Sequence, residues 1–135
     1  MTTTEPATAQ VDASSALANL YATVPLMRGS LLASVDGRVL AAEFDETRQD
    51  AIAAVVASGF ALGGKLAEVI GKNAVEEMIV RTNDGFVSLY SVGDRAVLAA
   101  MAMPDANIGL LNLYARKTAE TLSGLVPALL EGSST

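Results

Sequence analysis

The segment Gly59-Phe60-Ala61-Leu62-Gly63-Gly64-Lys65 has the glycine and lysine spacing of a phosphate-binding loop. Such a loop lies between a strand and a helix, and it needs Ser or Thr directly after the lysine to hold Mg²⁺. Here Leu66 follows the lysine, and sequence typical of a helix lies on both sides of the motif. The glycines are better explained as small residues that allow close packing of a helix. We therefore expect no nucleotide site in this segment.

Two pairs of adjacent carboxylates, Asp45-Glu46 and Glu76-Glu77, are the other groups that could do chemistry. Acid–base catalysis requires two carboxyl groups that converge on one pocket in different environments. Neighbouring residues at a helix start or on a strand usually point apart. The chain also has no Cys and no His, which excludes thiol nucleophiles, histidine bases and zinc sites built from these residues. The sequence thus predicts a protein that is not an enzyme and has no catalytic residue, metal or cofactor.

Composition indicates one compact domain with an acidic surface. Fifteen Asp and Glu against nine Lys and Arg give a net charge of −6, and the basic residues form no cluster that could follow a nucleic-acid backbone. Hydrophobic residues make up 51% of the chain but aromatic residues only 4%, so the core must consist mainly of aliphatic side chains. We find neither a signal peptide nor an uninterrupted apolar run of about twenty residues that would span a bilayer. We expect a cytoplasmic protein that does not bind nucleic acid or insert into a membrane.

The order of elements follows from apolar periodicity and turn residues. We predict helices over residues 12–23, 47–70 and 108–126, and strands over 30–34, 38–41, 75–82, 86–92 and 95–103. Tight turns are expected at Asp36-Gly37, Asn83-Asp84-Gly85 and Gly93-Asp94, with Asn107 as the cap and Pro127 as the late breaker of the last helix. Every strand then has a hairpin neighbour, which predicts a largely antiparallel sheet in the order α-β-β-α-β-β-β-α, with helices on its faces. Residues 12–131 would form the domain, with tails at 1–11 and 132–135.

The helix predicted over 47–70 has more apolar surface than one sheet can cover. On a helical wheel its polar residues gather in one narrow arc, and the apolar arc exceeds the stripe of roughly 100° that surface helices usually show. The wheel divides the apolar arc into two flanks. The bulky flank, expected to pack on the sheet, consists of Val55, Leu62, Leu66 and Val69; the small flank, expected to pack on the same helix of a second copy, consists of Val56, Phe60, Gly63, Gly64 and Ala67. The alternative is a helix enclosed within one larger core.

The polar arc is the part of this helix that remains for other partners. It contains Asp50, Ser58, Lys65 and Glu68, which we predict to bind a partner protein. The alternative is a solvated helix face with no partner.

Four segments together resemble the Roadblock (dynein light chain) family. They are GSLLASVDGRVLAAE, VVASGFALGGKLAEVI, EEMIVRTNDGFVSLYSVGDRAVLAAMA and PDANIGLLNLYARKTAETL. The likeness extends over roughly residues 12–126 and rests on the overall pattern more than on any invariant chemical motif. It implies a profilin-like α/β (α+β) fold with a five-stranded sheet, helices on both of its faces, and two copies that join their sheets with the central helices side by side.

The resemblance also implies a function through protein contacts. Family members bind small Ras-like GTPases or motor and signalling complexes, so we expect a homodimeric, non-catalytic adaptor or regulator of such a GTPase. In this fold the strand over 75–82 lies at the sheet edge. A twofold axis at Ile79 would then place Glu77 opposite Arg81 of the other copy. The alternatives are a structural assembly module without a GTPase partner and a small-molecule sensor domain.

Overall fold

Glycine-containing turns join the strands in the computed structural model, which describes residues 5–44, 47–71 and 74–133. Gly37 and Gly93 have φ angles of +94° and +61°, a left-handed conformation that favours glycine. In the first turn the N–H of Gly37 donates to the carbonyl of Ser34 at 2.9 Å. The carboxylate of Asp36 accepts hydrogen bonds from the Ser34 hydroxyl and from Arg38 Nε, and these bonds lower the pKa of Asp36. The predicted turns at Asp36-Gly37 and Gly93-Asp94 are confirmed.

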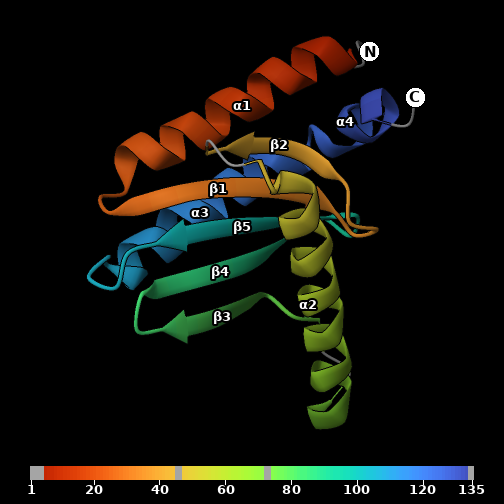
Figure 1. Cartoon of the computed structure of the whole chain (residues 1–135). Helices are drawn as coiled ribbons and strands as arrows, with labels where there is room; N and C mark the ends of the chain where they lie inside the picture. The colour runs from red at the N-terminus through yellow and green to blue at the C-terminus, as the bar shows by residue number, and fades with distance from the viewer. Residues whose placement is uncertain (1–4, 45–46, 72–73, 134–135) are drawn as a thin grey trace.

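The strands form one sheet in the order β2-β1-β5-β4-β3, and every neighbouring pair is antiparallel (Figure 1). The strands are β1 (Met27–Ser34), β2 (Val39–Glu43), β3 (Glu77–Thr82), β4 (Gly85–Val92) and β5 (Ala96–Ala102). This arrangement confirms the predicted number of strands and their hairpin pairing. Strand β5 lies at the centre, while β2 and β3 form the two edges of the sheet.

The helices are α1 (Pro6–Thr23), α2 (Gln49–Ile70), α3 (Ile108–Ser123) and α4 (Val126–Ser133). The predicted cap of α3 is confirmed, because the side chain of Asn107 accepts a hydrogen bond from the N–H of Leu110 at 3.0 Å. Two predictions about the ends of the chain are wrong. Residues 6–11 belong to α1 and residues 132–133 belong to α4, so neither segment is a tail. Pro127 lies at the start of α4, where proline is tolerated because the first helical N–H groups have no partner.

Alternate residues of the sheet contribute to two separate cores. On one face, Leu32, Leu98 and Tyr90 pack beneath α1, α3 and α4. On the other face, Leu31, Val97 and Leu89 pack beneath α2. The period of two along each strand therefore places helices on both faces of the sheet, as predicted.

Helix α2 crosses its face of the sheet and continues past the edge strand β3 (Figure 1). It begins near β2 and β1, and its C-terminal half projects beyond the body of the domain. The face of the sheet that α2 crosses is thus covered by fewer helices than the opposite face. Helix α2 is also longer than the part of the sheet that lies beneath it.

Candidate protein-interaction site

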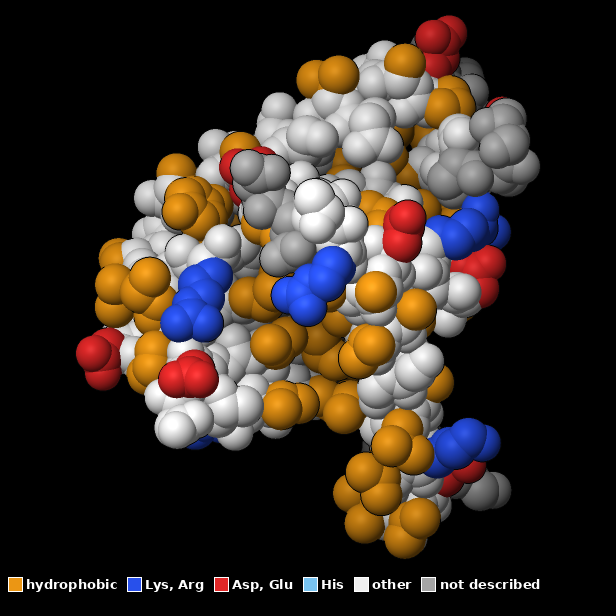
Figure 2. All heavy atoms as spheres, in the orientation of Figure 1, with side chains coloured by type: hydrophobic (Ala, Val, Ile, Leu, Met, Phe, Trp, Pro, Cys, Tyr) orange, Lys and Arg blue, Asp and Glu red, His pale blue; other side chains and the backbone are white. Residues whose placement is uncertain are grey.

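The projecting half of α2 exposes large apolar side chains. Leu62, Leu66, Val69 and Ile70 are 60%, 62%, 82% and 86% exposed. Figure 2 shows the apolar tip of the helix standing away from the rest of the molecule. Among the described helices, α2 alone has the length and mean hydropathy of a membrane-spanning segment. The charged residues Asp50, Lys65 and Glu68 lie along the same helix.

The two apolar flanks of α2 lie on the opposite sides from those predicted. The bulky flank does not pack on the sheet, since Val55 is 71% exposed and Leu62, Leu66 and Val69 are exposed too. The small flank faces the sheet instead: Val56 and Gly63 are buried, and Phe60 is partly buried against the same core. Small residues allow the helix to lie close over the sheet, which leaves the long side chains on the outer flank.

A groove lies between the N-terminal half of α2, which includes Val55 of the bulky flank, and the sheet. It has a volume of about 510 Å³, and its walls are apolar apart from Arg48 at one end. The helix supplies Ala51, Ile52, Val55 and Val56, and the sheet supplies Val80, Val87, Leu89, Ala99 and Met101. Figure 2 shows these apolar surfaces beside the helix, with basic side chains above them. The sequence reasoning missed the groove because it forms between segments that are far apart along the chain.

Edge strand β3 borders this groove. It is hydrogen-bonded to β4 on one side only, because no further strand follows it in the sheet order. Val80 projects toward the groove, whereas Glu77, Ile79 and Arg81 lie opposite Tyr90, Ser88 and Phe86 on the α3 face. The guanidinium of Arg81 lies 5.1 Å from the centre of the Phe86 ring. The three residues predicted for sheet pairing therefore share one face of β3.

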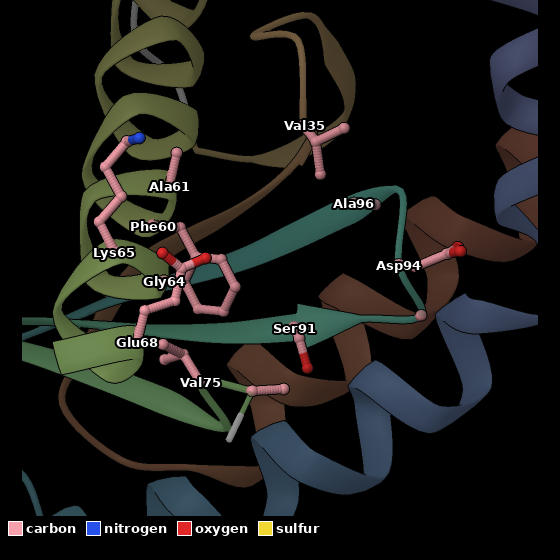
Figure 3. Close-up of a pocket in the computed structure, with 12 residues that line it drawn as sticks. Val35, Phe60, Ala61, Gly64, Lys65, Glu68, Val75, Ser91, Asp94 and Ala96 are labelled. Atoms are coloured by element: carbon pink, nitrogen blue, oxygen red, sulfur yellow. The ribbon is translucent and has the colours of Figure 1, made fainter. Parts of the chain in front are cut away.

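A second and larger hollow lies on the opposite flank of α2 (Figure 3). It has a volume of about 1010 Å³ between α2, the start of β5 and the turns that contain Val35 and Asp94. Lys65 and Glu68 line it together with Phe60 and Gly64. Of the four residues predicted to bind a partner, the structure therefore brings two to this cleft. Asp50 and Ser58 are exposed elsewhere on α2, and the Ser58 hydroxyl donates to the Ala54 carbonyl at 2.9 Å.

The chemical motifs have structural explanations. The glycine–lysine segment lies entirely inside α2, so its backbone N–H groups are used within the helix rather than in a phosphate-binding loop. The pair Asp45-Glu46 lies outside the described residues. Glu76 and Glu77 share Arg116 of α3, which lies 4.0 Å from Glu76 Oε2 and donates to Glu77 Oε1. Within the described ranges there is no group of Asp, Glu, His or Cys that could hold a metal ion.

Tyr90 lies opposite Glu77 in the sheet and points into the core beneath α3. Its hydroxyl donates to Asn112 Oδ1. Burial raises the pKa of Tyr90, and the nearby charge of Glu77 acts in the same direction. The start of the edge strand is thus connected to α3 through four residues, namely Arg116, Glu77, Tyr90 and Asn112. Arg116 was not singled out from the sequence, since it is separated from Glu77 by 39 positions.

Comparison with known proteins identifies the family. The sequence profile of the Roadblock/LC7 domain matches residues 15–102. No curated protein sequence matches the chain. A Roadblock/LC7 domain from Streptomyces avermitilis superposes with a TM-score of 0.78 at 21% identity, covering 87% of this chain and 97% of that one.

Two further solved structures share the fold. The gliding protein MglB from Thermus thermophilus has a TM-score of 0.80 at 21% identity, with 87% of this chain and 90% of that chain covered. Profilin IA from Acanthamoeba castellanii has a TM-score of 0.53 at 18% identity over 85% of this chain and 96% of that chain, which identifies the fold as profilin-like. Because the family profile spans more than half of the sequence, the chain belongs to the Roadblock/LC7 domain family.

Proposed function

We propose that this protein is a homodimeric, non-catalytic adaptor or regulator that binds a small Ras-like GTPase in the cytoplasm. The proposal of a dimer rests on one observation. A single chain presents both an exposed apolar helix end, which extends beyond the sheet, and an unfilled apolar groove. A twofold axis at the open edge of β3 would bring each helix end to the groove of the other copy. A C2 interface is self-complementary in this way.

The length of the projecting helix fits this arrangement. Gly63 packs over Met78 of β3, so residues 64–70 extend past the edge of their own sheet. At a rise of 1.5 Å per residue this segment is about 10 Å long, roughly two strand spacings. It would therefore reach across β3 and β4 of a second copy, the strands that contribute Val80 and Val87 to the groove.

The structure changes which residues we propose for the interface. Val56, Glu77, Ile79 and Arg81 stay in it, since Val56 lines the groove and the other three lie on the open edge strand. Phe60 and Gly63 contact their own chain, Gly64 lines the hollow on the other flank of the helix, and Ala67 is half-buried. We add the exposed bulky residues Leu62, Leu66 and Val69.

The proposal of a GTPase partner rests on the family membership and on the surface that the dimer would leave free. The cleft lined by Lys65 and Glu68 lies on the flank of α2 away from the groove, so a second copy would not cover it. Apolar walls with charged residues at the rim are typical of a protein-binding surface. We place partner recognition at this cleft.

Direct binding tests this assignment. The protein is titrated with a small Ras-like GTPase encoded beside it, loaded either with GDP or with a non-hydrolysable GTP analogue. We expect nucleotide-dependent affinity, and we expect the reversal Lys65→Glu with Glu68→Lys to lower it while the dimer remains. A matched control is Lys117→Glu with Glu120→Lys, which reverses a pair of the same spacing on α3.

The outcomes separate the candidate functions. Equal loss of affinity in both double variants would move recognition away from the cleft. Binding to neither nucleotide state, in a protein that remains dimeric, would favour the structural assembly module.

A further inference from the structure

Two hollows of this protein meet at the end of strand β4. The cleft beside α2 and a smaller hollow of about 350 Å³ on the α3 face share Ser91 and Gly93 in their walls. Strand β3 pairs with β4 only as far as Tyr90, so among the described strands Ser91 is paired with β5 alone. The side of β4 that faces away from β5 is therefore open here, and Figure 3 shows Ser91 at this end of the cleft. One exposed surface thus continues from α2 past the β4–β5 turn to α3.

The two hollows differ in the chemistry of their walls. In the cleft, Phe60 and Val75 are half-buried and Val35 is 53% exposed, so apolar side chains form much of its lining. The smaller hollow is lined mainly by polar and charged side chains, among them Glu120 and Ser123 of α3. A ligand that occupies both hollows therefore needs an apolar group for the cleft and polar groups for the smaller hollow.

The charged residues along this surface are predominantly acidic. Four carboxylates line the two hollows together with one lysine and one arginine: Glu68, Glu76, Asp94 and Glu120, with Lys65 and Arg116. Arg116 is already bound by Glu76 and Glu77. Glu68, Asp94 and Glu120 have no ion pair within the described part of the chain, and no group of the described acidic residues could hold a metal ion. The unmatched charge favours a partner whose positive charges are spaced apart.

We infer that this surface binds a basic, amphipathic segment of the partner protein. The inference rests on the proposed function and adds the chemistry of the partner. An apolar side chain of the segment lies against Phe60 and Val75, and its lysine or arginine side chains reach Glu68, Asp94 and Glu120. Long basic side chains suit this surface because their methylene groups cover apolar walls while their charged ends stay in water near the carboxylates.

Two synthetic peptides test this chemistry directly. One peptide alternates lysine with leucine, and the other alternates glutamate with leucine. Each is titrated into the isotope-labelled full chain, and the backbone amide resonances are followed by NMR. We expect the lysine peptide to shift the resonances of Ser91 and Gly93, where the two hollows meet, and the glutamate peptide to leave them in place. Equal shifts with both peptides, or shifts with neither, would overturn the inference.

Removal of charges should change the affinity for the lysine peptide in opposite directions. Asp94→Asn with Glu120→Gln should lower the affinity roughly 3- to 10-fold, because two ion pairs at an exposed rim are lost. Lys65→Gln should raise it, since the one lysine that lines the cleft would repel the peptide. An affinity that stays unchanged in both variants would contradict the inference.

The matched control for the double variant is Glu5→Gln with Asp105→Asn. It removes the same charge from two exposed positions that line neither hollow, and it should leave the affinity for the lysine peptide nearly unchanged. An equal loss of affinity in the control would show that the net charge of the chain attracts the peptide, which would also overturn the inference.

Titration with the Ras-like GTPase separates the two possible failures. If the GTPase binds with the same affinity to Asp94→Asn with Glu120→Gln as to the control variant, the proposed function holds and this inference is wrong. If neither nucleotide state of the GTPase binds while the lysine peptide shifts Ser91 and Gly93, the surface recognises basic segments and the proposed GTPase partner is wrong.

Discussion

Gly63 of α2 lies directly over the sulfur of Met78 in β3, and a β-carbon at position 63 would overlap that sulfur. This contact fixes where α2 passes over the edge of the sheet. It also explains why the small flank of the helix faces inward and the bulky flank faces out. Gly63, together with the buried Ala53 and Val56, thus contributes to the position of α2 over the sheet.

We predict that Gly63→Ala destabilises the folded protein even though alanine is the better helix former. The added methyl group must displace Met78, and overpacking of this kind typically costs about 1–3 kcal/mol. Gly64→Ala is the matched control, since nothing lies within 4 Å of a β-carbon at that position. It should raise stability by up to about 1 kcal/mol. Urea unfolding measures the free energy of unfolding of both variants. Equal free energies would mean that Met78 moves aside at no cost in stability.

Leu66→Glu should weaken self-association. Leu66 is 62% exposed in the single chain, and burial of that part of the side chain in the proposed dimer would contribute about 1–2 kcal/mol for each copy. A carboxylate there would lose that gain and face an apolar groove. Val11→Glu is the control, because Val11 is 64% exposed on α1 and lies far along the chain from the groove residues. Sedimentation equilibrium should show a higher dissociation constant for Leu66→Glu alone; equal constants would remove Leu66 from the interface.

Stability should fall at alkaline pH in part because of Tyr90. Burial raises the pKa of Tyr90 above its usual value of 10.0, so the folded protein keeps the phenol proton where the unfolded chain has already lost it. This contribution is complete below about pH 10 and is lost as the pH rises through the folded pKa. Tyr90→Phe should flatten the decline in the free energy of unfolding above pH 10, and an unchanged decline in this variant would contradict the prediction. The free energy of unfolding measured at several pH values decides between these outcomes.

Features encoded by neighbouring residues could be predicted from the sequence. The turns at Gly37 and Gly93 and the cap at Asn107 need only local backbone and side-chain chemistry, so the strands and α3 begin and end close to where we expected. The excess apolar surface of α2 was also evident from its periodicity. These signals were sufficient for the fold.

Features that depend on packing between distant segments could not be predicted in the same way. The wheel of α2 revealed two apolar flanks but not which one the sheet would bind, because that choice depends on Met78 and the residues beneath the helix. Pro127 suits the start of a helix as well as its end, so the sequence did not reveal α4. Arg116 and Glu77 meet only because α3 packs over β4 next to the edge strand.

The measurement that most directly tests the proposed dimer is sedimentation at micromolar concentration combined with thermal unfolding over a range of concentrations. We expect a species of twice the 13.9 kDa chain mass and a melting temperature that rises with protein concentration, since association stabilises only the folded form. A single 13.9 kDa species at those concentrations, with a melting temperature independent of concentration, would contradict the proposal that α2 and β3 join two copies.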